Sequence, residues 1–524
     1  MAVVDVAVVG YGPVGMAAAA LLGQRGHRVV VLERYPGLYN LPRAASFDDE
    51  TMRTLAGLGV AGELLPGLRV QGTYEWRNGR GELLLEQSFA ERGRSGWAEW
   101  YMMYQPQLEA ALDRRCRSLP NVEVRAASPV VGLEQGPEHV VLTTEGPGGR
   151  EAVRARYVVA CDGGNSFVRS ALGIASEDLG FSEPWMVCDF RFRRPTPVPP
   201  ALQLGDPSGP TSVISLGPAH HRFSFMLDSV DDFATERAPE RVWKRVASHL
   251  APEDADLIRV ATYTFRSLAA EHWRRGRVLL AGDAAHQMPP FLGQGMCSGF
   301  RDAQNLAFKL DLVLRGAVGD GILDTYQSER APHVRAVTEK GIELGHLQTL
   351  RDPARAAERD RTLLARRAAG STTPQPLRFP SLRDGFFSAV SAAGRGELSV
   401  QGVVADGDRA DRLDQVVGGG FHLLLQEHLV AALRDAGLLG PLTRAGVRVV
   451  VPGERAAEDS RVTLVRDVDG TYRDWFAVLE CGAVAVRPDF YVYGTARTPA
   501  ATAALAAELL RAVGAVGMGT DAPG

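Results

Sequence analysis

Glycines and acids placed directly after apolar runs are the residues of this chain best suited to chemistry. Gly10, Gly12 and Gly15 of the segment GYGPVG follow a Val-rich run, and Glu33 ends the next apolar run. The first glycine permits a tight turn, the second lets the backbone approach a pyrophosphate, and the third allows close helix packing. An acid about 20 residues later can accept hydrogen bonds from ribose hydroxyls. The pattern predicts a dinucleotide site, with an incidental glycine-rich turn as the alternative.

Two further acids end apolar runs later in the chain. Asp162 follows the run 158–160, and Asp283 follows the run 278–281. An acid at the carboxyl end of a parallel strand faces the crevice where ligands bind, so we expect Asp283 to hold a polyol such as a ribityl chain. Gly293 and Gly295 would let backbone N–H groups approach a flavin edge and stabilise its reduced, negatively charged form. These segments favour FAD over a nicotinamide.

The elements that must position these residues follow from hydrophobic periodicity. Residues 3–9, 16–25 and 27–32 predict a strand, a helix and a second strand, which together make a βαβ unit. The alternating segment 222–227 predicts an antiparallel strand of a second layer that faces the substrate. A buried strand followed by a helix at 298–314 then returns the chain to the first layer. The pattern indicates a nucleotide-binding domain interrupted by a sheet insertion.

Composition limits the classes of partner. The chain has 58 Lys+Arg and 62 Asp+Glu, a formal charge of -4, which lacks the basic excess of nucleic-acid binders. No apolar run reaches the roughly 18 residues that a membrane-spanning helix needs. The five cysteines form no Cys-x-x-Cys pair, so neither a zinc site nor a dithiol centre is indicated. We expect a cytoplasmic protein without nucleic-acid or membrane partners, either a monomer or a homodimer.

Several long motifs occur in a fixed order: GYGPVG, LPRAASFDDE, YQPQLE, VACDGGNSFVR, LLAGDAAHQMPPFLGQG, RDAQNLAFKL and DWFAVLECGAVAVRPDFYV. In these motifs the chain resembles the class A flavoprotein aromatic hydroxylases, with 3-(3-hydroxyphenyl)propionate hydroxylase and phenol hydroxylase as the nearest types. The resemblance implies an α/β fold with a Rossmann-like FAD-binding domain, an inserted antiparallel substrate sheet as in p-hydroxybenzoate hydroxylase, and a thioredoxin-like C-terminal domain.

The expected domains have the following bounds. The FAD-binding domain covers 1–180 and 271–350, with 66–104 contributing to the substrate sheet, and the substrate-binding sheet domain covers 181–270. Residues 351–384, which are Arg/Ala-rich and include Ser371 to Pro374, look like a linker. The thioredoxin-like domain covers 385–524, with strand-like segments at 421–425 and 447–451 and a helix at 499–513.

The resemblance also implies the reaction. An FAD-dependent monooxygenase of this family uses NAD(P)H and O2 to hydroxylate a phenolic or other aromatic small molecule through a flavin C4a-hydroperoxide. NAD(P)H would bind transiently as a cosubstrate, because the chain has no second glycine-rich unit to hold it. The alternative within the same chemistry is a Baeyer-Villiger or epoxidising enzyme that tailors a polyketide-like product. A flavin dehydrogenase that does not oxygenate, or a flavin-binding regulator, is the alternative from another class.

Cofactor roles can be carried over by position. Asp162 resembles the acid of the family's Asp-Gly fingerprint, which takes part in pyrophosphate binding and NAD(P)H docking. Arg43 and Gln105 would reach the phosphates or the ribityl chain, and the loop 290–296 would line the isoalloxazine ring. The implied cofactor-binding residues are Gly10, Gly12, Gly15, Glu33, Arg34, Arg43, Gln105, Asp162, Asp283, Pro290, Gly293, Gln294, Gly295 and Met296.

Two catalytic groups follow from the same resemblance. Asp48 matches an acid that assists deprotonation of the substrate hydroxyl in phenol hydroxylases, although it could equally be a helix-capping acid. The Pro290 carbonyl would face the reacting hydroxyl. His286 could either serve as a base or pin its loop, and Phe225 and Met226 are the candidate substrate contacts, of which alternation makes one a core residue.

One position departs from the family pattern. Many relatives carry Asn after the sequence Gly-Gln-Gly-Met, whereas Cys297 stands here. A side-chain hydrogen bond to the flavin is therefore in doubt at this position, and we interpret Cys297 as a small buried residue.

Overall fold

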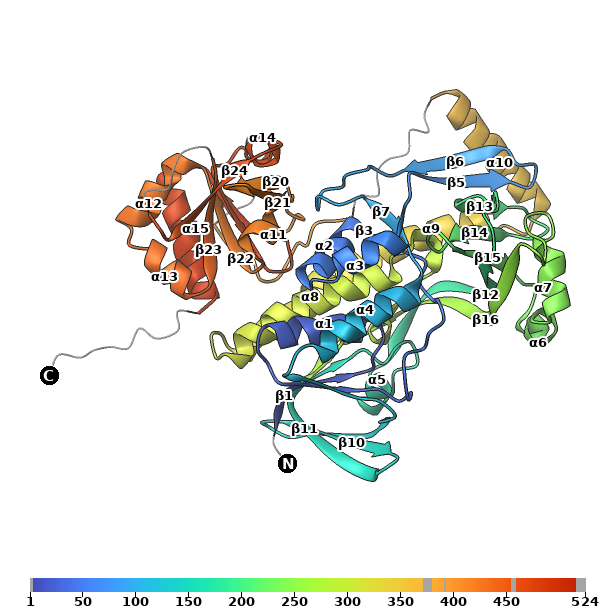
Figure 1. Cartoon of the computed structure of the whole chain (residues 1–524), viewed down its shortest axis with the longest axis horizontal. Helices are drawn as coiled ribbons and strands as arrows, with labels where there is room; N and C mark the ends of the chain where they lie inside the picture. Colours follow the sequence, from blue (N-terminus) through green and yellow to red (C-terminus); the bar gives the residue numbers. More distant parts are fainter. Residues whose placement is uncertain (1–2, 371–378, 391–392, 454–458, 515–524) are drawn as a thin grey trace.

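The computed structural model describes residues 3–370, 379–390, 393–453 and 459–514. Three large sheets organise them, each covered by its own helices (Figure 1). The expected segment Ser371 to Pro374 lies outside the described residues. Among the described helices, none has the length and apolarity needed to cross a membrane.

The first sheet is built from the apolar runs of the N-terminal region and has a parallel core. Helix α1 (Pro13–Gln24) packs between α4 (Gln105–Arg117) and α8 (Gly295–Leu314) on one side of it (Figure 1). Strands β9 (Val130–Gln135) and β10 (Val140–Gly146) extend it through β11. Its main strands in spatial order are β17 (Arg274–Arg275), β18 (Val278–Leu280), β11 (Gly149–Ala160), β1 (Val4–Val9), β2 (Val29–Leu32) and β8 (Val122–Arg125).

The parallel core explains where the acids and glycines meet. Strands β2, β1, β11 and β18 lie side by side and point the same way. Their last residues are therefore at one edge of the sheet, and the chain leaves them at Gly10, Glu33, Cys161 and Ala281. The residues that the sequence analysis singled out after each strand consequently gather at this edge.

The second sheet is the predicted antiparallel layer. Among its described strands, β13 and β5 form the one parallel pair, and the other neighbours are antiparallel. The N-terminal strands β5 and β6 join it at one end. Its strands in spatial order are β19 (His286–Gln287), β16 (Ala255–Ala270), β12 (Ser176–Phe192), β15 (His220–Met226), β14 (Thr211–Ser215), β13 (Ala201–Gly205), β5 (Thr73–Asn78) and β6 (Leu83–Ser88).

A small sheet and a helix connect these layers. Strand β7 (Trp100–Met102) pairs with β3 (Ser46–Asp48) and β4 (Arg69–Val70). Helix α2 (Asp49–Gly57) follows β3 directly and packs on α8. The short helix α3 (Ala61–Leu64) packs on α2 and α4 in this region, whereas the short helix α5 (Phe167–Ala171) packs on β9 of the first sheet.

The C-terminal unit has a seven-stranded mixed sheet. Helix α15 (Pro499–Ala512) packs on α12 (Val430–Asp435), α13 (Leu439–Arg444) and the sheet, close to the predicted bounds. The thioredoxin-like character of this unit stays a prediction. Its strands in spatial order are β21 (Arg409–Arg412), β20 (Val403–Asp406), β24 (Val462–Asp467), β23 (Val447–Pro452), β22 (Phe421–Leu425), β25 (Ala483–Val486) and β26 (Val492–Ala496).

Buried charges join the C-terminal unit to the rest. Glu329 of α9 (Thr325–Gln348) pairs with Lys309 at 2.9 Å and with Arg487 at 2.7 Å, and all three side chains are fully buried. Arg53 of α2 pairs with Asp414 at 2.6 Å. Because such pairs need their partners in place, they fix the relative position of the two parts.

The expected linker differs from the structure. Residues 353–368 form α10 (Pro353–Ala368), which packs on β6. Its Asp352 side chain accepts a hydrogen bond from the Arg355 backbone as a helix cap. An Arg/Ala-rich composition suits an exposed helix as well as a linker, so composition alone does not separate the two.

Candidate active site

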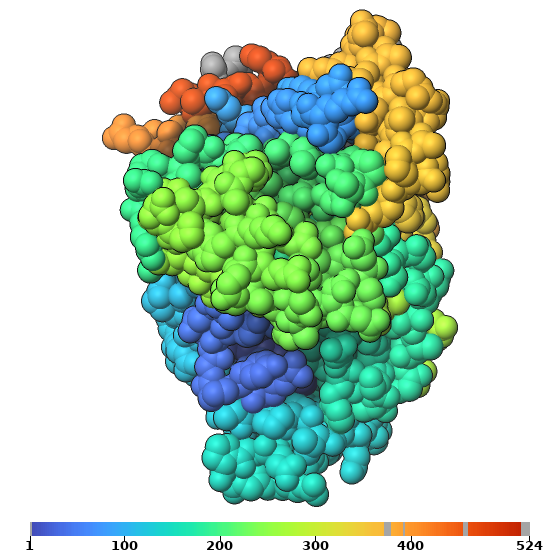
Figure 2. Space-filling view, turned by 90° about the vertical axis from the view of Figure 1, so that its right-hand side faces the viewer, coloured from blue at the N-terminus to red at the C-terminus, as the bar shows by residue number. Residues whose placement is uncertain are grey.

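One cavity of about 630 Å³ runs from the carboxyl edge of the first sheet to the inner face of the second sheet. In the space-filling view a hollow opens between the blue segment that follows β2 and the green region above it (Figure 2). Of the predicted cofactor residues, all line this cavity except Gly15 and Gln294. The cavity therefore brings together residues that lie far apart in the sequence.

The turn after β1 has the geometry expected of its glycines. Gly10 has a φ of +98°, and a Cβ there would lie 2.4 Å from the Cys161 carbonyl oxygen. A Cβ on Gly15 would lie 2.1 Å from the Gly10 carbonyl oxygen, which explains why Gly15 packs the helix rather than lining the cavity. A Cβ on Gly12 would meet nothing within 4 Å. Gly12 therefore presents bare backbone to the cavity at the N-terminus of α1.

Acids at the neighbouring strand ends hold the surrounding loops. The Glu33 carboxylate accepts hydrogen bonds from the backbone N–H groups of Tyr11 at 2.7 Å and Tyr35 at 2.9 Å. Asp162 accepts from the Ser166 hydroxyl at 2.6 Å and the Val168 backbone at 3.0 Å. Burial raises the pKa of Asp162 despite these bonds. Both acids thus shape the cavity wall as well as lining it.

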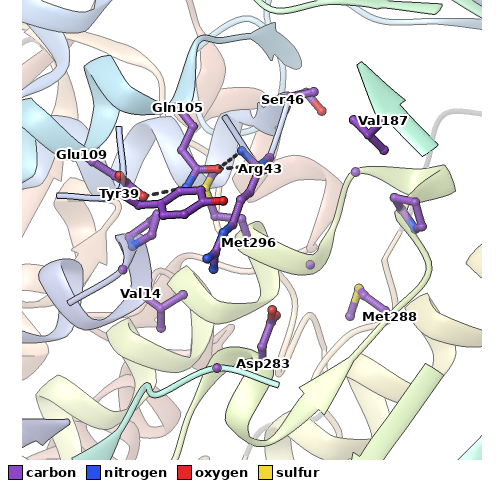
Figure 3. A pocket seen from close by; sticks show the side chains of 18 of the residues that line it. Val14, Tyr39, Arg43, Ser46, Gln105, Glu109, Val187, Asp283, Met288 and Met296 are labelled. Carbon is purple, nitrogen blue, oxygen red and sulfur yellow. Dashed lines mark hydrogen bonds between the residues drawn. The ribbon is translucent and has the colours of Figure 1, made fainter. Parts of the chain in front are cut away.

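The middle of the cavity has polar groups on two sides (Figure 3). On one side the Gln105 side-chain oxygen accepts from the Arg43 backbone at 3.0 Å, and its amino group donates to Glu109 at 2.6 Å. The Arg43 guanidinium lies over the Tyr39 ring at 4.3 Å. Asp283 projects from the other side. Burial raises the pKa of Asp283, opposed by the charges of His286 and Arg43.

Asp283 is the free acceptor of this region. Its carboxylate is open to the cavity, and no hydrogen bond to it is formed by the part of the chain that the structure describes. Once a ligand displaces the water around it, this carboxylate is costly unless it accepts hydrogen bonds from that ligand. A polyol chain in the cavity would supply such donors, as the ribityl prediction requires.

The loop after β19 forms the next stretch of wall. Pro290, Gly293, Gly295 and Met296 line the cavity, and Gly293 has a φ of +61°. Helix α8 starts at Gly295, so its free N–H groups and positive end face the cavity. Gln294 is turned inward and is 1 % exposed. The loop therefore presents backbone donors to any anionic ring edge held there.

The thiol of Cys297 and the imidazole of His286 do not line the cavity. Cys297 is fully buried, and burial raises its pKa to about 12, so the thiol is inert as expected. His286 is 2 % exposed, and its Nε2 lies 2.6 Å from Asp302. His286 is thus placed to pin its loop, the second of its two predicted roles.

The Asp48 carboxylate is occupied by hydrogen bonds and an ion pair within the protein. Its carboxylate accepts from the Thr51 backbone at 2.9 Å and pairs with Arg301 at 2.5 Å, and Gln294 donates to it at 3.2 Å. Burial alone would raise the pKa of Asp48, but Arg301 and Thr51 outweigh it and hold the pKa below its usual range. Asp48 is 3 % exposed and does not line the cavity. The geometry matches the helix-capping alternative and not a base in contact with substrate.

The far end of the cavity is an aromatic chamber, formed by the inner face of the second sheet and the residues that face it. Trp185 stacks with Phe265, and Phe291 packs on the edges of both rings. The chamber is lined by Tyr74, Trp76, Phe89, Trp100, Met102, Trp185, Val187, Gln203, Ser212, Ile214, Arg222, Ser224, Tyr263, Phe265 and Phe291. Such walls suit a flat ring and exclude water.

The predicted substrate contacts Phe225 and Met226 are not among these lining residues. Phe225 points to the opposite face of β15 and belongs to the core behind the sheet. Met226 packs against Trp185 and Phe291, beyond the cavity. Arg222 and Ser224 line the chamber instead, because alternate residues of a strand share a face.

Arg222 carries the positive charge at the chamber. Its guanidinium donates to Asp189 at 2.6 and 3.1 Å and to the backbone carbonyls of Pro42 and Arg43. Arg259 also pairs with Asp189, at 3.2 Å. Two guanidinium groups therefore share one carboxylate, which leaves a local excess of positive charge beside Tyr263.

These features fit FAD. The bare backbone at Gly12 and the α1 N-terminus suit a pyrophosphate, and the unpartnered Asp283 suits the ribityl hydroxyls. The loop 290–296 and the α8 N-terminus suit the pyrimidine edge of the flavin. The remaining aromatic chamber is then the space for a second, ring-shaped ligand.

Comparison with known proteins gives consistent results. Residues 3–341 match the family of FAD binding domains, and residues 396–512 match the HcaD C-terminal domain family. A probable NADH-specific resorcinol 4-hydroxylase of Rhodococcus jostii (strain RHA1) is 50% identical over 523 residues, covering 99% of this chain and 97% of the relative. A 3-(3-hydroxy-phenyl)propionate/3-hydroxycinnamic acid hydroxylase of Klebsiella pneumoniae (strain 342) is 33% identical, covering 93% and 91%.

A solved structure extends the similarity to the fold. The ternary complex of aklavinone-11 hydroxylase with FAD and aklavinone superposes with a TM-score of 0.77 at 26% identity. The alignment covers 97% of this chain and 98% of that chain.

Proposed function

Because the chain belongs to the family of FAD-dependent aromatic hydroxylases, we propose that its substrate is a small neutral phenol of the resorcinol type and that NADH is its reductant. The predicted family and the predicted monooxygenase activity with FAD and a reduced nicotinamide are confirmed. The aromatic hydroxylase prediction fits these relatives better than the Baeyer-Villiger or epoxidising alternative.

The observation that carries the substrate proposal is that the Arg222 guanidinium already donates its hydrogen bonds to other protein groups. A substrate carboxylate buried in the chamber would need a bidentate Arg or a Lys partner. Among the described residues that line the cavity, the cations are Arg34, Arg43 and Arg222, and only Arg222 belongs to the substrate sheet. Its four hydrogen bonds already go to Asp189 and two backbone carbonyls. The charge around Arg222 is positive, but its engaged N–H groups offer no free pair to a carboxylate, so the chamber favours a ring that carries only hydroxyl groups over an arylpropionate.

The charge excess around Arg222 supports the chemistry. Two guanidinium groups on one carboxylate favour ionisation of a phenol bound near them. A phenolate ring is more nucleophilic than a phenol ring, which is what aromatic hydroxylation requires. The aromatic walls position the ring and exclude water from it.

Bound FAD supplies the hydride acceptor for the nicotinamide and the site where dioxygen is activated. Around it, the α8 N-terminus with Gly293 and Gly295 would stabilise negative charge on the ring edge. The Pro290 carbonyl accepts from the Gly293 backbone at 2.9 Å and keeps a lone pair for the substrate hydroxyl. We assign Asp48 to positioning of α2 and Arg301, and the other lining residues to the cofactor roles given above.

The proposal also covers the other substrates, the oligomeric state and the cellular compartment. Dioxygen is the second substrate, NADH binds transiently, and the protein is a monomer or homodimer of the cytoplasm. Five free cysteines, of which four are buried, support a reducing compartment.

The test compares two substrates on the wild-type enzyme. We expect kcat/KM for resorcinol, measured by NADH oxidation coupled to product formation, to exceed that for 3-(3-hydroxyphenyl)propionate by about a hundredfold or more. A preference for the carboxylate-bearing compound would overturn the substrate proposal. NADH and NADPH compared at fixed resorcinol concentration test the reductant.

A further inference from the structure

A row of side chains crosses the chamber face of the second sheet. Trp76 lies directly opposite Gln203, and Gln203 lies opposite Ser212. Ser212 in turn lies opposite Ser224 on β15. Side chains at directly paired positions project from the same face of a sheet, and these four all line the cavity. The centre of an otherwise aromatic wall is therefore polar.

Two polar atoms of this row have no hydrogen-bond partner in the part of the chain that the structure describes. The side-chain amino group of Gln203 donates to the Tyr74 hydroxyl, whereas its oxygen accepts no hydrogen bond. The Trp76 indole N–H also lacks an acceptor. Gln203 is 2 % exposed and Trp76 is 8 % exposed. Buried polar groups are almost always hydrogen-bonded. Neither atom is exposed to the cavity, although both residues line it, so a small rotation of each side chain has to bring these atoms to a partner that enters the cavity.

The Gln203 amide is held in place at its other end. Tyr74 contacts both Gln203 and Ser212, and burial raises the pKa of Tyr74 to about 12, so its hydroxyl keeps its proton at neutral pH. A protonated hydroxyl both donates and accepts. The Tyr74 hydroxyl can therefore bind either the amino group or the oxygen of the Gln203 amide. The other atom of the amide is then left to bind a donor or an acceptor of the substrate.

We propose that Gln203 is a specificity-determining residue that binds a second hydroxyl group of the substrate, with the Trp76 indole N–H as its companion donor. A phenolic hydroxyl both donates and accepts, so it can donate to the Gln203 oxygen and accept from the indole. This inference rests on the proposed function, since it concerns the ring that the chamber binds. It deepens that function by selecting dihydroxybenzenes over phenols with one hydroxyl.

The test uses Gln203→Met, which keeps the length of the side chain and removes the amide. The control is Gln71→Met, because Gln71 is also buried, also has an unpaired oxygen, and does not line the cavity. Dissociation constants for resorcinol and for phenol are measured by titration of the flavin absorbance, together with kcat/KM for resorcinol. Bound FAD per chain and melting temperature report whether each variant is folded.

Gln203→Met should weaken resorcinol binding about tenfold, the effect of about 1.4 kcal/mol, and leave phenol binding within about twofold. Gln71→Met should change neither. Equal weakening of resorcinol and phenol, or no weakening of resorcinol, would overturn the inference. If Gln203→Met fails to fold, Tyr74→Phe, which removes the support of the amide, should show the same selective loss. The proposed function fails separately, when the wild-type enzyme hydroxylates no neutral dihydroxybenzene.

Discussion

Asp48→Asn separates the two roles predicted for this acid. Asparagine caps a helix as well as aspartate does, so the bond from the Thr51 backbone survives. The substitution removes one of the two carboxylates that pair with Arg301, and Glu50 remains at 2.6 Å. Removing one partner of a buried ion pair costs about 3–5 kcal/mol. Because Glu50 still compensates the charge, we expect a loss of about 2–3 kcal/mol, with kcat reduced by less than about fivefold.

The assay combines denaturant unfolding of the FAD-bound enzyme with single-turnover hydroxylation at saturating substrate. Glu50→Gln is the matched control, because Glu50 pairs with the same guanidinium and is not the helix cap. Both variants should lose similar stability and keep similar activity. A general base in contact with substrate would contribute about a hundredfold or more. Stability unchanged in Asp48→Asn together with a loss of that size would refute the positioning role.

Three further predictions concern the glycine turn, the start of α2 and the contact with the C-terminal unit. Gly12→Val should fold normally, because its Cβ meets no atom within 4 Å, yet lower FAD affinity about tenfold or more in equilibrium titration; unchanged affinity would contradict the assigned pyrophosphate position. Burial raises the pKa of Asp49 to about 7, so between about pH 4 and pH 7 the native carboxyl keeps a proton that the unfolded chain releases, and stability falls as pH rises. Asp49→Asn should flatten the dependence of melting temperature on pH across this window, and a slope equal to that of the wild type would speak against the shift. Glu329→Gln should destabilise the enzyme by about 3 kcal/mol or more in denaturant unfolding, since Lys309 and Arg487 lose a buried partner; wild-type stability would contradict this role.

The cofactor half of the site could be predicted because its signals are local. An apolar run predicts a buried strand, and the glycine or acid that follows it must lie at the strand end. Gly10, Glu33, Asp162 and Asp283 each follow such a run, and all line one cavity. The parallel order of the strands is what brings these separate predictions together.

The chamber could not be predicted in the same way, since its contacts depend on sheet register. Tyr74 and Gln203 are 129 residues apart, and no local pattern pairs them. Alternation around Ser224 separates the two faces of β15 but does not tell which one is the inner face. Asp48 shows the same limit, because its partner Arg301 lies 253 residues further on.

We propose that this chain hydroxylates a neutral dihydroxybenzene in the aromatic chamber beside FAD. The most direct measurement supplies the FAD-loaded enzyme with NADH, resorcinol and isotopically labelled dioxygen, and analyses the products by mass spectrometry. We predict a trihydroxybenzene that carries one labelled oxygen atom, formed in step with NADH oxidation. Unchanged resorcinol, with NADH consumed only to hydrogen peroxide or not at all, would contradict the account.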